Sequence, residues 1–195
     1  QMGREYNSQI LKQYEIYQNE DLQNYVQSIG ESLALKSHRP NLVYRFTVLD
    51  SPDINAFALP GGYIYINRGL MSFLSSEEEL AAVLGHEIGH VTARHSVKQY
   101  SQSQLLGILS TAIEMNSGST AGNIANLASG ALLSGYGRDM ELEADDLGSQ
   151  YIFQEGYSPQ AMYEVLSVLK DQEIYAKKIA EQRGQEPRSY HGVFA

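Results

Sequence analysis

The chain has 195 residues, of which 43% are hydrophobic and 19% are charged. This composition is typical of a globular domain and excludes an intrinsically disordered chain or a collagen-like fibre. Acidic residues outnumber basic ones by 23 to 14, and no basic cluster offers a surface for phosphate groups. We therefore expect no nucleic-acid partner.

The sequence contains no cysteine, which excludes disulfide scaffolds, thiol catalysis and zinc sites built on thiolates. No apolar run approaches the roughly 20 residues that span a bilayer, and the N-terminus has no signal-peptide core. We expect either a cytoplasmic protein or an exported one whose signal segment has been removed.

The first 36 residues have the spacing of amphipathic helices. Apolar side chains recur every three or four positions over 4–35, and Asn19 is placed to cap a second helix. The break around Pro40 ends this pattern. We predict a helical N-terminal segment over 1–36.

Strand periodicity follows. Apolar and polar residues alternate over 42–49, and two further β segments over 55–67 flank Pro60-Gly61-Gly62, where proline and glycine favour a tight turn. The pattern predicts a hairpin and a small sheet over 42–67.

A capping box opens the next predicted helix. Ser76 is followed three residues later by a glutamate, and apolar residues then recur at helical spacing. We predict a helix over 76–98. Gly85 and Gly89 lower its helix propensity, which the close approach of another backbone or a metal ion would explain.

The second half of the chain begins with a segment rich in glycine, serine, alanine and asparagine over 117–137, which predicts loops around a short apolar helix and suits a mobile flap. Helices are predicted over 139–155, ended by Gly156, and over 159–182, begun by a Ser-Pro pair. No repeat or interdomain linker interrupts the chain. We therefore expect a single domain over 1–195.

The chemistry is concentrated in His86-Glu87-Ile88-Gly89-His90. On a helix, histidines four residues apart lie on one face and can grip one metal ion. Glu87 then occupies the general-base position of zinc peptidases. Chance produces this pattern in roughly one chain in a hundred of this composition, so a metal site explains it better than two incidental histidines.

Catalytic zinc usually has three protein ligands and one open position. His95 is out of register for the extended motif that adds a third histidine, and a cysteine ligand is excluded. A carboxylate remains, and Glu141 could supply it. Asp145, one helical turn further on, could hold the outer nitrogen of a ligand histidine. A solvated acidic face is the other explanation of this common Glu-x-x-x-Asp spacing.

Three segments in this order resemble the HtpX-like and BepA-like zinc metallopeptidases, the family that includes the CaaX prenyl proteases. They are Asn55 to Tyr65, His86 to His90 and Glu141 to Asp145, within a resemblance that runs roughly from Gly3 to the C-terminus. It implies an α+β fold, mainly helical and zincin-like, with a small sheet and an active-site helix that carries His-Glu-Ile-Gly-His. The metal ligands that it implies, for one zinc ion per chain, are His86, His90 and Glu141.

The resemblance also implies that Glu87 is the catalytic base and Asp145 a catalytic partner carboxylate, sometimes assigned as proton donor. Since no spanning segment is present, the soluble exported branch fits better than the membrane-embedded one. That branch implies a periplasmic or lipid-anchored envelope protein of a bacterium, with envelope assembly partners. Its members continue into a helical-repeat domain, so we expect a longer parent protein.

The resulting hypothesis is a zinc metalloendopeptidase that hydrolyses peptide bonds in unfolded or misassembled envelope proteins. Extended polypeptides are expected to add as a β-strand near Asn55 to Leu59. The alternative is a chaperone-like binder with latent or minor proteolysis, but mere binding does not need Glu87 as a base. A structural zinc site is disfavoured because such sites are closed.

The sequence leaves several candidates for the metal and for the residue that stabilises the oxyanion. Imidazole and carboxylate ligands also accept cobalt, manganese or iron. His38 and His95 are interpreted as structural. The candidates for oxyanion stabilisation, each with an ordinary packing or surface role as its other explanation, are Tyr136, Arg138, Tyr190 and His191.

Overall fold

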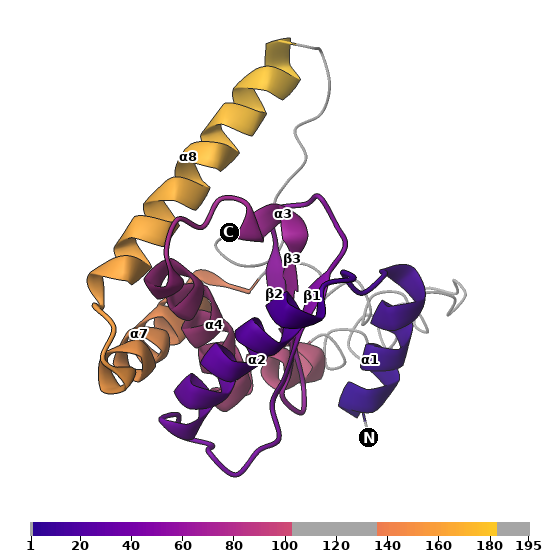
Figure 1. Ribbon diagram of the computed structural model, residues 1–195, viewed down its shortest axis with the longest axis vertical. Coiled ribbons are helices and arrows are strands. Elements are labelled where there is room, and N and C mark those ends of the chain that lie inside the picture. The colour runs from indigo at the N-terminus through magenta and orange to yellow at the C-terminus, as the bar shows by residue number, and fades with distance from the viewer. Residues whose placement is uncertain (1, 103–135, 183–195) are drawn as a thin grey trace, which may run out of the picture.

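The structure is a computed structural model that describes residues 2–102 and 136–182 (Figure 1). It is an α+β fold, mainly helical with one small sheet, as the sequence predicted. The elements are α1 (Met2–Gln13), α2 (Glu20–Leu35), β1 (Arg45–Leu49), β2 (Ala56–Leu59), β3 (Tyr63–Asn67), α3 (Arg68–Met71), α4 (Glu77–Thr92), α7 (Arg138–Glu155) and α8 (Gln160–Gln182). Most of the predicted glycine-rich segment lies outside the described residues, as do Tyr190 and His191.

The three strands are ordered β1-β3-β2, with β3 parallel to β1 and antiparallel to β2. The predicted hairpin is therefore present, and its turn places Gly61 and Gly62 at φ values of 92° and 86°, where a Cβ would be strained. The first strand is shorter than predicted, since 42–44 lie outside it. Within this sheet β2 is an edge strand, and it packs against α4.

Helix α4 lies at the centre of the fold and contacts α2, α7, α8 and β2 (Figure 1). Ser76 caps it, because its side-chain oxygen accepts a hydrogen bond from the backbone N–H of Glu79 at 3.2 Å. Every residue over 80–91 is buried. A helix that is buried all round can carry polar side chains only where they have partners or a function. Its two histidines therefore need such an explanation.

Small residues allow α4 and α7 to pack closely. A Cβ added to Gly89 would lie 2.7 Å from the carbonyl oxygen of Ala144, and one added to Gly85 would lie 3.1 Å from that of Gly148. The expected close approach at Gly85 and Gly89 is therefore made by the backbone of α7. This contact brings the first turns of α7 over the histidine-bearing face of α4.

The predicted extent of the active-site helix was wrong at its C-terminal end. Helix α4 stops at Thr92, and after the cap residue Ala93 the backbone of Arg94 adopts a φ of 59° before helical geometry resumes over 95–102. No glycine or proline marks this break, so hydrophobic spacing ran through it. The break redirects His95 toward α4.

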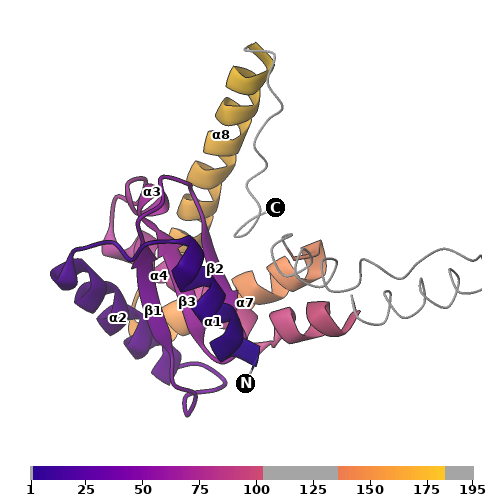
Figure 2. The same cartoon turned by 90° about the vertical axis from the view of Figure 1, so that its right-hand side faces the viewer.

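The main core joins α2, one face of the sheet, α4, α7 and α8 through residues such as Val26, Phe46, Leu84 and Ile152. A smaller cluster under α1 covers the other face of the sheet. Helix α8 extends beyond the rest of the described chain in both views (Figures 1 and 2). Across 2–102 and 136–182, no helix combines the length and hydrophobicity that crossing a bilayer requires.

Candidate metal centre

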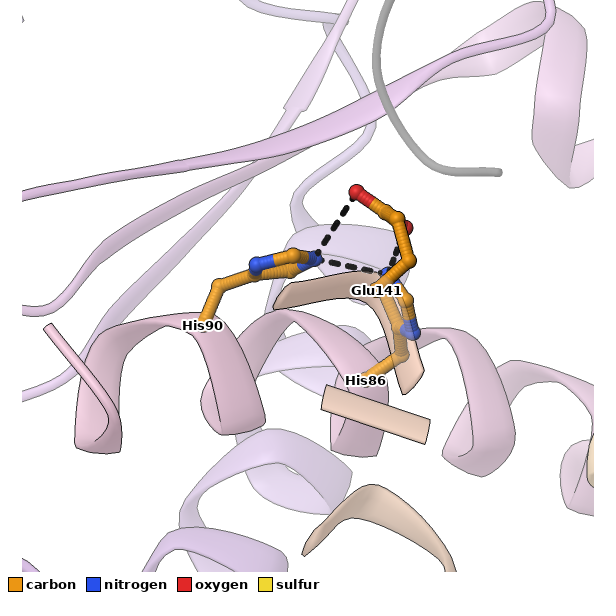
Figure 3. Close-up of side chains that lie close together, drawn as sticks. All are labelled: His86, His90 and Glu141. Carbon is orange, nitrogen blue, oxygen red and sulfur yellow. Dashed lines mark hydrogen bonds and ion pairs between the residues drawn. The ribbon is translucent and has the colours of Figure 1, made fainter. Parts of the chain in front are cut away.

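His86 and His90 project from one face of α4 toward Glu141 in the first turn of α7 (Figure 3). The two Nε2 atoms are 2.8 Å apart. The Glu141 carboxylate oxygens lie 3.3 Å from Nε2 of His86 and 3.7 Å from Nε2 of His90. Each residue offers one ligand atom, and these three atoms all lie within 4.8 Å of one another. The three side chains could therefore hold one metal ion.

The surroundings of these atoms suit a cation. His86 and His90 are almost fully buried. Among the described residues, the two buried oxygens of Glu141 make ion-pair contacts with the imidazoles at 3.3 and 3.7 Å but no hydrogen bond. An unsatisfied buried carboxylate is costly unless a positive charge compensates it. Two imidazole nitrogens and one carboxylate match zinc, and also cobalt, manganese or iron.

The protonation pattern of the metal-free site supports this fit. Burial by itself lowers the pKa of His86, but the hydrogen bond to Asp145, the contact with Glu141 and nearby negative charge raise it to about 9. Burial, with the charge on His86 and His95, lowers the pKa of His90. Burial raises the pKa of Glu141, and the charge on His86 opposes that shift. At neutral pH the imidazole of His86 in the metal-free site is therefore positively charged. A bound metal ion would supply the positive charge in its place.

Glu87 lies beside the three ligand candidates without belonging to their group. It is 1% exposed, and its Oε2 atom has no hydrogen-bond partner in the described part of the chain. Burial raises its pKa to about 8, against the lowering effect of charged His86. A nearby metal cation favours the ionised form of such a carboxylate. This side chain is therefore free to exchange a proton with a group that enters the site.

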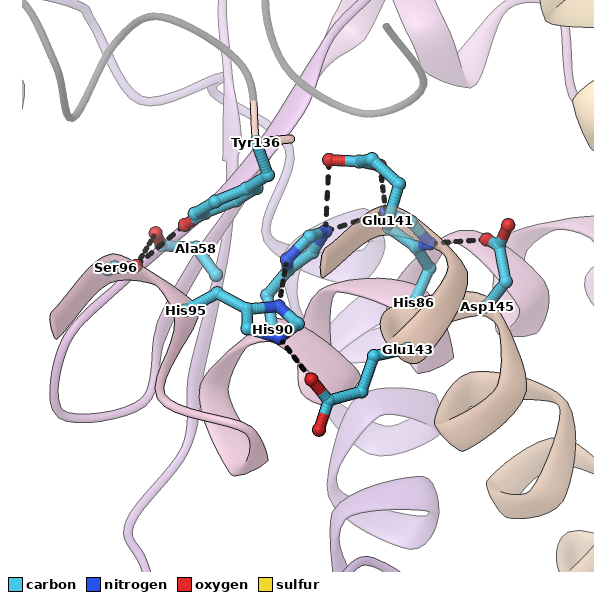
Figure 4. Close-up of polar contacts among 9 residues, drawn as sticks. All are labelled: Ala58, His86, His90, His95, Ser96, Tyr136, Glu141, Glu143 and Asp145. Carbon is cyan, nitrogen blue, oxygen red and sulfur yellow. Dashed lines mark hydrogen bonds and ion pairs between the residues drawn. The ribbon is translucent and has the colours of Figure 1, made fainter. Parts of the chain in front are cut away.

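Each histidine has an outer hydrogen-bond partner (Figure 4). Nδ1 of His86 contacts Oδ1 of Asp145 at 2.8 Å, the contact expected of Asp145. Nδ1 of His90 contacts Nδ1 of His95 at 2.8 Å, and Nε2 of His95 contacts Oε2 of Glu143 at 3.0 Å. The sequence favours a structural role for His95 and assigns no role to Glu143. The signal that could have pointed to this contact is the histidine five residues after His90.

Tyr136 covers the other side of His90. Its ring stacks on the imidazole with centroids 4.1 Å apart, and its hydroxyl lies 2.7 Å from the Ser96 hydroxyl, which donates to the carbonyl of Ala58 in β2 at 3.2 Å. Burial raises the pKa of Tyr136, so its hydroxyl keeps its proton. Of the other oxyanion candidates inside the described residues, Arg138 is exposed on the surface.

A cavity of about 300 Å³ adjoins the centre on the side of β2. It lies between the C-terminal end of α4 and the turn that joins β2 to β3, and His90 and Leu59 both line it. The cavity therefore lies between the end of β2 and His90.

Comparison with known proteins defines the class. Residues 20–191 match the model of peptidase family M48, and the chain belongs to that family. Membership of this peptidase family confirms the family resemblance drawn from the three sequence segments.

Named relatives give the same assignment. The β-barrel assembly-enhancing proteases of Yersinia pestis and of Escherichia coli (strain K12) are each 30% identical, over 92% and 93% of this chain respectively and 39% of each relative. The mitochondrial metalloendopeptidase OMA1 of Arabidopsis thaliana is 29% identical over 81% of this chain and 33% of its own length. The chain spans about two fifths of the length of the β-barrel assembly-enhancing proteases that it matches.

Proposed function

We propose that residues 1–195 form the catalytic domain of a zinc metalloendopeptidase that cleaves unfolded or misassembled polypeptides of the bacterial envelope. The observation that carries this proposal is the convergence of His86, His90 and the buried carboxylate of Glu141, which accepts no hydrogen bond from the described residues, beside the buried Glu87. Family membership supports the reaction class. Relatives named for β-barrel assembly support a periplasmic or lipid-anchored location, because bacterial β-barrel proteins are built in the outer membrane.

His86, His90 and Glu141 would hold one zinc ion, and Asp145 would fix the ring of His86 by accepting the hydrogen bond from Nδ1. Zinc bound there would supply a Lewis acid that activates water and polarises the scissile carbonyl. The buried position of all three ligands keeps bulk water from competing for the metal-binding atoms.

Glu87 is assigned as the general base. It accepts a proton from the water molecule that attacks the peptide carbonyl, and the new carbon–oxygen bond forms as this proton leaves. Glu87 then delivers the proton to the amide nitrogen, and the carbon–nitrogen bond breaks to release the amine. Its free Oε2 atom and its place next to His86 suit both transfers.

Extended polypeptides are proposed to add along β2, close to the segment Asn55 to Leu59. This strand is at the edge of the sheet, packs against α4 and ends at the cavity beside His90. Backbone hydrogen bonds to an edge strand accept many sequences, which suits a protease of unfolded chains. Ser96 already bonds the carbonyl of Ala58, so an added strand shares or displaces that contact. We also propose that the protein binds partners that assemble envelope proteins.

The test compares cleavage of an unfolded polypeptide by the zinc-loaded wild type, by Glu87→Gln and by Glu78→Gln, an exposed position on the same helix. We expect Glu87→Gln to lose roughly 10²- to 10⁴-fold in rate while it still binds zinc and polypeptide, and Glu78→Gln to match the wild type. A chelator should stop all cleavage. Cleavage that persists in Glu87→Gln contradicts the mechanism, and binding without cleavage by the wild type supports the chaperone-like alternative.

A further inference from the structure

The two histidines of the centre differ in their outer partners. Nδ1 of His86 contacts a carboxylate directly, whereas Nδ1 of His90 contacts another imidazole, that of His95. Building on the proposed metal site, we propose that His95 and Glu143 form a relay that fixes the ring of His90 in its metal-binding orientation. His95 and Glu143 are then positioning residues for the centre, with Glu143 as the distant counterpart of Asp145.

The hydrogen bonds of this relay can all be donated in the same direction, from His90 to His95 and from His95 to Glu143. Nε2 of His90 faces the ligand group, 2.8 Å from Nε2 of His86, and when this atom binds the metal the ring proton sits on Nδ1. Nδ1 of His95 accepts that proton's hydrogen bond at 2.8 Å, which leaves the His95 proton on Nε2. Oε2 of Glu143 accepts from that Nε2 at 3.0 Å. Every nitrogen of the two rings thus has one defined role.

Burial gives the relay its rigidity. His95 is 0% exposed and its ring has partners at both nitrogens, while Tyr136 stacks on the ring of His90. The side chain of Glu143 is 49% exposed and also lies 3.7 Å from Nζ of Lys98, so solvent and Lys98 weaken its pull. Loss of His95 should therefore affect the metal centre more than loss of Glu143 does.

The backbone break at Arg94 makes the relay possible. In an uninterrupted helix, positions five apart are rotated by about 140°, and His95 would point away from His90. The φ of 59° at Arg94 turns the chain so that the two rings meet. Since Glu141 and Glu143 both lie in the first turns of α7, docking of that helix supplies the metal ligand and the end of the relay together.

The test measures zinc affinity by competition with a chromophoric chelator, and the visible spectrum of the cobalt-loaded protein, for His95→Leu, His95→Gln and Glu143→Gln. The matched control is His38→Leu, since His38 bonds Tyr151 outside the centre. We expect His95→Leu to bind zinc roughly 10- to 100-fold more weakly with a changed cobalt spectrum, His95→Gln to recover part of the loss and Glu143→Gln to show a smaller loss. Adding Glu143→Gln to His95→Leu should have no further effect.

Zinc binding by His95→Leu that equals that of the wild type overturns the relay, and so do equal losses in His38→Leu. If His95→Leu does not fold, Glu143→Gln becomes the deciding variant, because its side chain is half exposed and its substitution should not prevent folding. Unchanged zinc affinity and an unchanged cobalt spectrum in Glu143→Gln then overturn the relay. A wild type that binds no zinc refutes the proposed metal centre itself, which is a different outcome.

A second inference comes from the cavity beside His90. Its lining includes the apolar residues Leu59 and Val97 and two arginines, Arg39 and Arg94. Arg39 donates a hydrogen bond to the carbonyl of Val91 at 3.1 Å. In the part of the chain that the structure describes, neither arginine forms an ion pair with an acidic side chain, although the chain has a net charge of −9.

Arg94 also occupies a strained place. It is the one described residue other than glycine with a positive φ, at the position after a helix cap where glycine fits without strain. Resting on the proposed function, we infer that the cavity is a subsite for a carboxylate of the polypeptide substrate, held by Arg39 and Arg94 next to the scissile bond.

The test uses fluorogenic peptides that carry one Glu, or the isosteric Gln, at successive positions around the cleaved bond, and a second pair with a free or an amidated C-terminus. We expect kcat/KM to favour Glu at one position by about tenfold in the wild type, with the preference lost in Arg94→Gln and kept in Arg45→Gln, an arginine on β1. A preference for the free C-terminus alone assigns the carboxylate to the chain end. Equal cleavage of every pair overturns the subsite, whereas no cleavage of any peptide refutes the proposed function.

Discussion

The packing of α4 on α7 yields a prediction about Gly89→Ala. The added Cβ would lie 2.7 Å from the carbonyl oxygen and 3.0 Å from Cα of Ala144. Ordinary contact begins at 3.4 Å, so α7 must move away from α4 by about 0.7 Å at this point. The obstacle is backbone rather than the end of a flexible side chain, so a change of rotamer cannot relieve it.

Two opposing effects set the magnitude. Alanine in place of glycine inside a helix stabilises it by up to about 1 kcal/mol, whereas overpacking a tight contact costs about 1–3 kcal/mol. We expect a net loss of about 1 kcal/mol in the free energy of unfolding. Glu141 lies about one turn before Ala144, so its carboxylate retreats from the histidines and zinc affinity falls about tenfold.

The assay combines urea unfolding of the chelator-treated protein with a zinc competition titration. Gly137→Ala is the control, because no atom lies within 4 Å of its added Cβ. Gly137 is the N-cap of α7, where alanine caps less well than glycine, so the control can lose some stability but should keep zinc affinity near its wild-type value. A Gly89→Ala protein that is more stable than the wild type and binds zinc equally well would show that the helices do not need this close approach.

Three further predictions address protonation, the outer partner of His86 and the helix cap. The pKa values of His86 and Glu87 lie above their ordinary values of 6.5 and 4.5, at about 9 and about 8, so the metal-free protein should lose thermal stability as pH rises toward about 9. Because zinc displaces the proton of His86, zinc affinity should increase over the same range, and a pH-independent affinity would contradict the raised pKa. Asp145→Asn should weaken zinc binding roughly 10- to 100-fold in chelator competition, while Asp146→Asn, on the exposed surface, should not. Ser76→Ala should lower the free energy of unfolding by about 1 kcal/mol in urea titrations, and an equal loss in Ser75→Ala would argue against the cap.

Local sequence signals were enough for several elements. Helix α4 could be predicted from its capping serine and its apolar spacing, and the hairpin from Pro60-Gly61-Gly62, because these patterns act between residues close in the chain. The placing of His86, Glu87 and His90 on one helix follows from the same periodicity. Gly85 and Gly89 also signalled a close approach, although the sequence could not say that α7 makes it.

Contacts between distant segments required the tertiary structure. Glu141 was a candidate ligand from the chemistry of the missing donor and from family resemblance, but its spacing alone was common, and the docking of α7 on α4 brings it to the histidines. His95 and Glu143 are 48 residues apart, and no periodic pattern links them. Hydrophobic spacing ran through Arg94, so the helix was predicted to continue past the break that turns His95 inward.

The sequence by itself determined which residues carry the chemistry and which helix holds the motif, because helix periodicity and capping depend on neighbours within one or two turns. Only the tertiary structure decided what surrounds the motif. The left-handed backbone at Arg94 and the packing of α7 depend on contacts across the whole core, and such contacts leave no local signature in the chain.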